Sequence, residues 1–141
     1  MRRVRMAAGL LMVVGLVGCG SSTAPSPVPV VEGQWQGPIT SPADGTGTIK
    51  ADLKQSGAAV TGSVVLSQPF LPDAPGTFTG TIETVAGKTT LRYTMFYDYH
   101  DGCTGTYGGS LDLSGTVLSV TYIGQNCAHT FTGSVRIERT Q

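Results

Sequence analysis

The sequence has little charge, few aromatic residues and no segment with the periodicity of a helix. Only 13% of its 141 residues are charged, and it has a single tryptophan. No stretch repeats apolar residues every 3.6 positions, and Gly and Thr are too abundant for helices. These absences argue against a helical fold, and the length fits one domain with appendages.

The residue patterns that usually carry catalysis are also missing. The chain has no Gly-x-Ser-x-Gly elbow, no complete Gly-x-x-x-x-Gly-Lys-Ser/Thr phosphate loop, and no His-x-x-x-His pair. Residue type alone still allows a His–carboxylate pair with a Ser or Thr nucleophile, but no motif places these residues together. Because the motifs are missing, we expect a protein that is not an enzyme and that binds no cofactor or metal.

The first eighteen residues have the parts of a secretory signal peptide. Met1–Arg5 is basic, and Met6–Val17 is an unbroken run of apolar or small residues. A membrane-spanning helix needs about 20 apolar residues, so this run is too short to span a bilayer comfortably. Removal of residues 1–18 leaves six basic against nine acidic residues. The resulting net charge of −3 offers no basic patch for nucleic acid.

The segment Leu16-Val17-Gly18-Cys19 resembles the lipobox of bacterial lipoproteins, with an aliphatic residue, a small or aliphatic residue, Gly or Ala, and then Cys. The resemblance implies that Cys19 becomes the lipidated N-terminus and anchors the chain in a membrane. The alternatives are an ordinary signal peptide with a chance cysteine, or an uncleaved anchor. Enterobacterial lipoproteins kept at the inner membrane have Asp where this chain has Gly20. We therefore expect a lipid-anchored protein of the cell envelope, at the outer membrane and facing the periplasm or the surface.

The cysteine count agrees with this resemblance. Three cysteines leave one unpaired in an exported chain. If Cys19 is lipidated, Cys103 and Cys127 remain as a pair, and we predict a disulfide between them. A bridge closing that loop would contribute roughly 3 kcal/mol to stability.

Three regions follow from these patterns: a signal peptide at 1–18, a lipidated cysteine with a Ser/Pro-rich linker at 19–33, and a β domain at 34–141. Alternating prolines in Ser21–Val31 favour an extended, semi-rigid spacer without a core of its own. At about 3.1 Å per residue, we expect this disordered linker to hold the domain some 30 Å from the lipid.

The domain reads as short strands with one buried face each. Cys103–Leu113 and Cys127–Ile137 repeat one pattern: a cysteine, small polar residues, then aromatic-x-Gly-Ser-apolar-x-apolar. Alternation with a period of two indicates strands of an antiparallel sheet with one wet side. The eight predicted strands are Gln34–Thr40, Thr48–Gln55, Ala59–Ser67, Thr77–Thr84, Thr89–Tyr99, Thr106–Ser114, Thr116–Gly124 and Thr130–Arg139.

Tight turns and longer connections alternate along these strands. The tight turns lie at 55–58, 85–88 and 114–115, and the longer connections at 41–47, 68–76, 100–105 and 125–129. In an up-and-down meander, alternate connections lie at opposite ends, so the long ones share one end with both cysteines. Inward-facing glycines recur in the strands and let them coil. We predict an all-β, eight-stranded antiparallel up-and-down barrel of the calycin type, with a two-sheet sandwich as the alternative.

Gly33-Gln34-Trp35 resembles the Gly-x-Trp opening of lipocalins and avidins. The resemblance implies that Trp35 packs across the closed end of the barrel. Avidins line their biotin pocket with several tryptophans, whereas this chain has one, so we expect no biotin site. The mature chain also looks similar to small β-barrel lipoproteins of environmental bacteria.

The end with the longer connections gathers the candidate binding residues. They are Phe70, Asp98, Tyr99, His100, Asp101, Asn126 and His129. Their spacing does not indicate a metal site, and the simplest interpretation is polar loop residues beside a disulfide. We expect a monomeric, lipid-anchored binding module that takes a small apolar or amphipathic ligand at this mouth. The alternative is an interaction or inhibitor protein that presents its loops to another envelope or extracellular protein. The predicted barrel is similar in architecture to small barrel lipoproteins that inhibit lysozyme. An interior void of a few hundred Å³ would favour the ligand-binding module, and a packed interior would favour the interaction protein.

Overall fold

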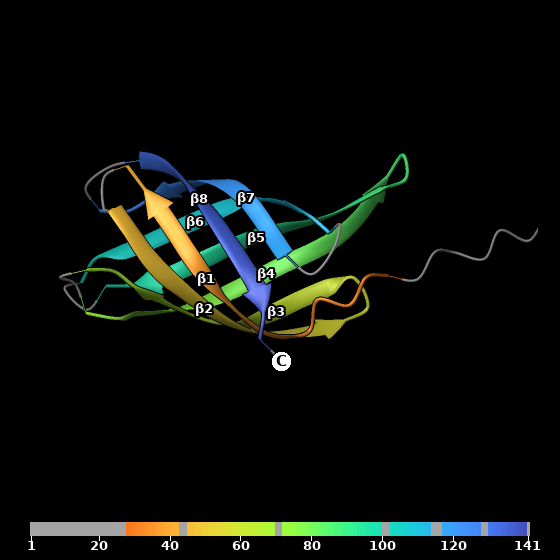
Figure 1. The fold of residues 1–141 in the computed structure, drawn as a ribbon, viewed down its shortest axis with the longest axis horizontal. Helices are drawn as coiled ribbons and strands as arrows, with labels where there is room; N and C mark the ends of the chain where they lie inside the picture. Colours follow the sequence, from red (N-terminus) through yellow and green to blue (C-terminus); the bar gives the residue numbers. More distant parts are fainter. Residues whose placement is uncertain are drawn as a thin grey trace, which may run out of the picture.

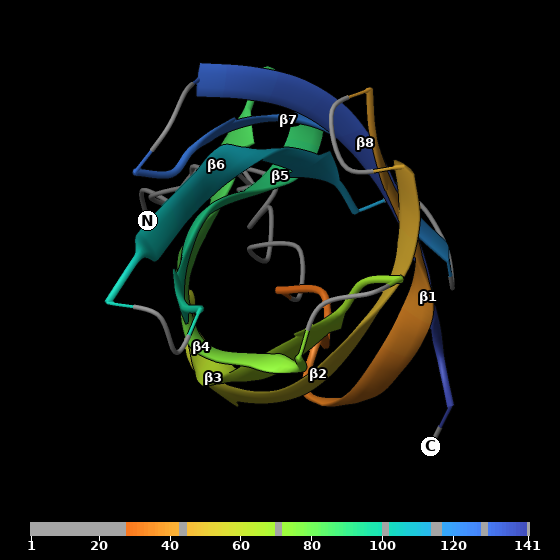
Figure 2. The ribbon, with the colours of Figure 1, turned by 90° about the vertical axis from the view of Figure 1, so that its left-hand side faces the viewer.

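The computed structural model describes residues 28–42, 45–69, 72–99, 102–113, 117–127 and 130–140, without the side chain of Phe131. Eight antiparallel strands each pair with the next, and the last pairs with the first, which closes a barrel (Figures 1 and 2). The strands are β1 Gly33–Ser41, β2 Gly45–Ser56, β3 Ala59–Ser67, β4 Ala74–Val85, β5 Lys88–Asp98, β6 Thr104–Asp112, β7 Val117–Gln125 and β8 Thr130–Arg139. The predicted all-β up-and-down barrel is confirmed. In the part of the chain that is described, no helix is long and apolar enough to cross a bilayer.

Alternating burial along the strands explains why these segments form a barrel wall. In β5, Leu91 and Tyr97 are fully buried while Arg92 and Phe96 are exposed. A strand with one apolar face lowers its free energy by burying that face, and ring closure also removes the unpaired edges of the sheet. Every predicted strand lies within three residues of the observed bounds.

The connections differ in part from the prediction. Two are two-residue hairpin turns at the predicted positions, in which Gly57 and Gly87 have φ of 61° and 79°, a conformation that glycine adopts without steric cost. The expected tight turn at 114–115, between β6 and β7, lies outside the described residues. The expected long connection at 41–47 is wrong, because the ladder of β1 and β2 continues to the pair Ser41↔Gly45.

Two glycines allow β1 and β8 to close the ring. A Cβ on Gly37 would collide with the backbone of Arg136 in β8, and a Cβ on Gly133 would collide with the backbone of Thr40 in β1. The Tyr122 ring also lies over Gly133, where the absence of a side chain leaves room for it. Larger side chains at these two positions would therefore push apart the strands that complete the barrel.

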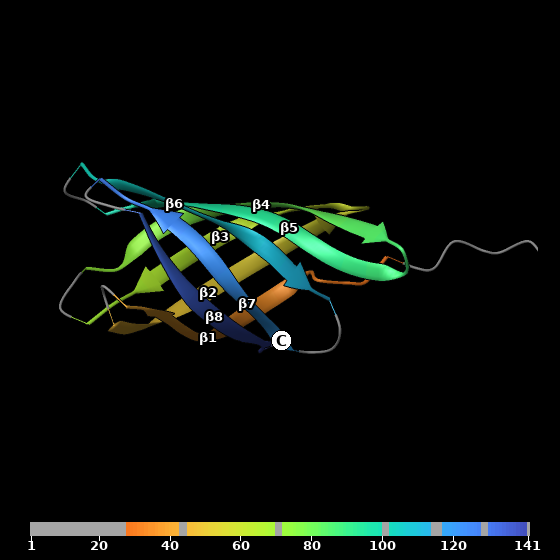
Figure 3. The ribbon, with the colours of Figure 1, turned by 90° about the horizontal axis from the view of Figure 1, so that it is seen from above.

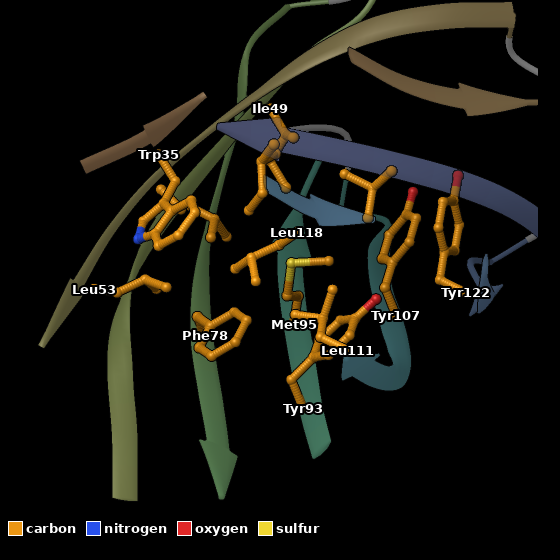
Figure 4. Close-up of a cluster of buried hydrophobic side chains, with 14 of the residues drawn as sticks. Trp35, Ile49, Leu53, Phe78, Tyr93, Met95, Tyr107, Leu111, Leu118 and Tyr122 are labelled. Atoms are coloured by element: carbon orange, nitrogen blue, oxygen red, sulfur yellow. The ribbon is translucent and has the colours of Figure 1, made fainter. Parts of the chain in front are cut away.

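The core is graded along the barrel axis. Figure 4 shows Trp35 and Leu53 toward one end, Met95 in the middle, and Tyr107 and Tyr122 toward the other end. Apolar and aromatic side chains from β2, β4, β5, β6, β7 and β8 surround an internal cavity of only about 20 Å³. That volume is about enough for one water molecule. The part of the interior that these side chains bound is therefore filled.

Candidate functional site

A short segment before β1, Val28–Glu32, closes one end of the barrel and is termed the cap. Figure 2 looks into the barrel from the opposite end and shows the orange cap within the outline of the ring. Val31 is 3% exposed and belongs to the core together with Trp35. The indole Nε1 of Trp35 donates a hydrogen bond to the carbonyl of Val31 at 2.9 Å. Trp35 thus packs at the closed end, as the lipocalin and avidin resemblance implied.

Two further side chains hold the backbone of the cap. Gln55, at the end of β2, accepts from the Val31 N–H at 2.8 Å and donates to the Pro29 carbonyl at 3.0 Å. Arg139, at the end of β8, donates to the Val30 carbonyl at 2.6 Å. These bonds supply partners to backbone groups of the cap that would otherwise be removed from water without a hydrogen bond. The sequence analysis assigned the cap, residues 28–32, to the linker, whereas in the structure the cap packs on the barrel.

The capped end also has an open groove of about 280 Å³ beside Trp35. The Arg139 guanidinium lies 5.0 Å from the centre of the Trp35 ring. The groove is lined by Pro29, Val30, Val31, Trp35, Leu113, Leu118 and Arg139. The lining side chains are thus apolar or aromatic apart from the Arg139 guanidinium, which lies over the Trp35 ring.

Cys103 and Cys127 form a disulfide at the opposite end of the barrel, which is termed the disulfide end. Their Cα atoms are 5.6 Å apart, and the bridge joins two positions separated by 24 residues. It links the connection after β5 to the connection after β7. The predicted pairing is therefore confirmed.

The disulfide lies just beyond the shortest ladder between consecutive strands. β6 pairs with β5 over nine residue pairs but with β7 over three, and Figure 3 shows β6 and β7 seen from above. The three pairs are Thr106↔Gln125, Tyr107↔Gly124 and Gly108↔Ile123. The covalent bond therefore adds a constraint where hydrogen bonds between the two strands are few.

Tyrosine side chains fill the interior beneath the disulfide. The ring of Tyr107 lies 4.9 Å from that of Tyr97 and 5.2 Å from that of Tyr122, measured between centroids. The hydroxyl groups of Tyr107 and Tyr99 are hydrogen-bonded to each other. The Tyr122 hydroxyl donates to the Thr40 carbonyl at 3.4 Å. These four rings form a layer, termed the tyrosine layer, across the disulfide end.

Tyr93 lies deeper in the core, where its ring stacks on Phe78 at 5.5 Å and its hydroxyl faces Gly109. Of the buried side-chain polar atoms in the described residues, this hydroxyl oxygen alone has no hydrogen-bond partner. Burial raises the pKa of Tyr93 and Tyr97 well above the ordinary value of 10.0. Burial, followed by the hydrogen bond to Tyr99, likewise raises the pKa of Tyr107. These phenols therefore stay neutral near pH 7.

The structure brings together some of the predicted mouth residues. Tyr99 turns toward the interior and joins the tyrosine layer, while its backbone N–H donates to the Cys103 carbonyl at 2.9 Å. Asp98 ends β5 as an exposed residue, and Asn126, which follows β7, is partly buried. The other predicted members, Phe70, His100, Asp101 and His129, lie outside the described residues.

The outer wall carries an apolar pair near the disulfide end that sequence analysis did not single out. Phe96 on β5 is 46% exposed and Ile123 on β7 is 64% exposed. Both flank β6, since Phe96 pairs with Thr106 and Ile123 pairs with Gly108. We term this surface the Phe96–Ile123 wall. An outward-facing Phe and Ile in alternating strands were the available signal, but alternation identifies the face and not its purpose.

No group of three His, Cys, Asp or Glu side chains that could hold a metal ion occurs among the residues that the structure describes. Comparison with protein-family models, with curated proteins and with solved structures finds no match to this chain. The barrel itself is compatible with a lipocalin-like or avidin-like architecture.

Proposed function

We propose that this chain is a bacterial lipoprotein whose barrel acts as a protein-interaction module in the cell envelope. The anchor is supported by the basic N-terminus, the apolar run and Leu16-Val17-Gly18-Cys19. The disulfide between the other two cysteines leaves Cys19 as the remaining cysteine, which is available for acylation. The role is binding and not catalysis.

The filled interior is the observation that favours a protein partner over a small ligand. Pockets for small molecules usually enclose about 300–1,000 Å³. The internal cavity of about 20 Å³ is far below that range, and Tyr99, Tyr107 and Tyr122 lie between it and the disulfide end. Carriage of an apolar ligand in this core would require these packed side chains to move. An outer surface is therefore the better supported site.

The Phe96–Ile123 wall is the proposed contact surface. Its two large apolar side chains are exposed in a wall whose other outward residues are mostly Thr and Ser, and Gly108 between them adds no side chain. Such a surface allows a partner to bury both side chains at once, as the anchors of protein interfaces do. The neighbouring disulfide holds β6 and β7 together at this position.

Native mass spectrometry of the lipid-free domain from its expression host separates the two roles. We expect the mass of the polypeptide with one disulfide and nothing else. A retained small molecule would contradict the interaction role and support the carrier. Acyl labelling of the full chain tests the anchor independently, because Cys19→Ala should abolish processing and labelling.

Photo-crosslinking in cells tests the contact surface. A photoreactive residue replacing Ile123 should give a discrete protein adduct, whereas the same residue replacing Thr61, exposed on β3, should not. The additional substitution Phe96→Ser should weaken the Ile123 adduct, because the partner loses its second anchor. Equal adducts from both positions would contradict this surface.

A further inference from the structure

Three exposed valines surround the capped end of the barrel. Val28 is 45% exposed and Val30 is 69% exposed on the outer side of the cap. Val85 is 70% exposed beside the β4–β5 turn, which projects at the same end (Figures 1 and 3). They are three of the five large apolar residues that are exposed in the described part of the chain. The other two form the Phe96–Ile123 wall.

The fixing of the cap explains why Val30 faces outward. Its carbonyl accepts from Arg139, and the neighbouring Val31 is buried in the core with its N–H bonded to Gln55. Because alternate residues of an extended segment point to opposite sides, burial of Val31 presents Val28 and Val30 to the outside. The exposed valines are thus held in place by the barrel.

The Lys and Arg residues are unevenly distributed along the barrel axis. Lys50 lies near the middle of β2, and the other Lys and Arg side chains of the described residues lie in the half of the barrel nearer the cap. They are Lys54, Lys88, Arg92, Arg136 and Arg139. Three of them pair with acidic residues, through Lys88–Asp112, Arg92–Glu83 and Arg136–Glu138. At the disulfide end the described charged side chains are Asp73 and Asp98.

An anionic lipid surface would therefore favour one orientation of this barrel. The described residues of the half nearer the cap include as many acidic as basic residues, so this half has no net charge and brings the exposed valines toward the lipid, while the carboxylates at the disulfide end are repelled by it. The acidic residues of that half are Glu32, Asp52, Glu83, Asp112 and Glu138. Val28 is the ninth residue after Cys19, so a fully extended chain of that length spans about 30 Å. A lipid anchor on Cys19 therefore keeps the capped end within reach of the bilayer.

We infer that the capped end is a membrane-contact surface, with Val28, Val30 and Val85 seated in the interfacial region of the bilayer. The inference rests on the proposed lipid anchor at Cys19. It makes the membrane a second, orienting partner of the barrel. The Phe96–Ile123 wall and the disulfide end then face the aqueous side, where a protein partner can reach them.

Fluorescent labels on the acylated chain test the contact. Val30→Cys, Val85→Cys and a control at the other end, Thr46→Cys, are labelled with a polarity-sensitive dye and reconstituted into vesicles of phosphatidylethanolamine and phosphatidylglycerol. We expect labels at Val30 and Val85 to shift to shorter emission wavelengths and to lose most of their quenching by aqueous iodide. The Thr46 label should keep the emission and quenching that it shows on the lipid-free domain.

A charged substitution gives a second measurement. In the chain labelled at Val30→Cys, Val85→Asp should restore iodide quenching, because a carboxylate cannot enter the interface without cost. The matched variant Phe96→Asp should leave quenching low. Retained quenching at Val30 and Val85, with mass spectrometry showing an acylated Cys19, would overturn the membrane contact and leave the anchor standing. A chain without acylation would instead contradict the proposed anchor.

Discussion

At the capped end, the barrel is closed by a segment whose backbone is hydrogen-bonded to Trp35, Gln55 and Arg139. At the disulfide end, a layer of tyrosines fills the interior and one covalent bridge joins neighbouring connections. The first closure depends on contacts that the folded barrel itself supplies. The second adds a bond that forms only under oxidising conditions, as in an exported protein. The two ends should therefore fail under different perturbations.

The largest expected loss concerns the capped end. Trp35→Ala should destabilise the barrel by about 4 kcal/mol, because it removes a buried ring and the hydrogen bond that holds the Val31 carbonyl. Urea unfolding would give the loss, and hydrogen exchange should show the cap opening while the disulfide end stays protected. Trp35→Phe, which retains an aromatic ring, is the control and should cost less. Equal exchange at both ends would contradict independent closures.

The next perturbation acts on the disulfide end. Replacing Cys103 and Cys127 together by Ser should destabilise the barrel by about 3 kcal/mol, because the unfolded chain loses the constraint of a 24-residue loop. Hydrogen exchange should increase most along the three-pair ladder of β6 and β7. The amide of Val31 should keep its protection, and a loss there would show that the two ends are coupled.

A glycine substitution tests the pairing of β1 with β8, which closes the barrel between the two ends. Gly133→Val should destabilise by about 1–3 kcal/mol, because the new side chain meets the Tyr122 ring and the backbone of Thr40. Gly108→Ala is the matched control, since the nearest atom to a Cβ there is 3.5 Å away. Thermal melting should separate the two variants. Similar melting temperatures would remove the steric role of Gly133.

The mildest perturbation is alkaline pH, with no effect expected near neutrality. Burial raises the pKa of Tyr93 and Tyr97 above the ordinary value of 10.0, so these phenols bind protons more tightly in the folded state than in the unfolded chain. Their stabilisation is complete below pH 10 and is lost as the pH rises above it. Urea midpoints measured across this range, together with tyrosinate absorbance, would detect the decline. A midpoint that stays constant above pH 10 would contradict it.

The wall of the barrel could be predicted because its determinants are local. Alternation in β5 requires only neighbouring residues, and the turn between β4 and β5 is set by two adjacent residues with positive φ, Ala86 and Gly87. The cap could not be predicted in this way, because its bonds from Val31 to Gln55 and from Arg139 to Val30 join positions 24 and 109 residues apart. The apolar pair Val30-Val31 after the prolines was the available hint.

Strand pairing beyond the turns was also hidden from the sequence. The segment Ser114-Gly115 has the composition of a tight hairpin, yet β6 and β7 keep only three pairs near their other ends. Alternation shows which face of a strand is buried but not whether two edges meet. Of the candidate mouth residues, Tyr99 proved to belong to the tyrosine layer, since its hydroxyl meets that of Tyr107.

The pairing of β8 with β1 has a consequence for synthesis. Gln36 and Thr40 acquire their neighbours Glu138 and Ser134 only when the carboxyl-terminal strand is available. A ribosome-bound chain stopped before that strand would present two bare edges, which invite aggregation with other chains. If the chain is exported, as proposed above, transport of the completed, unfolded polypeptide should therefore be favoured, with ring formation as the final step.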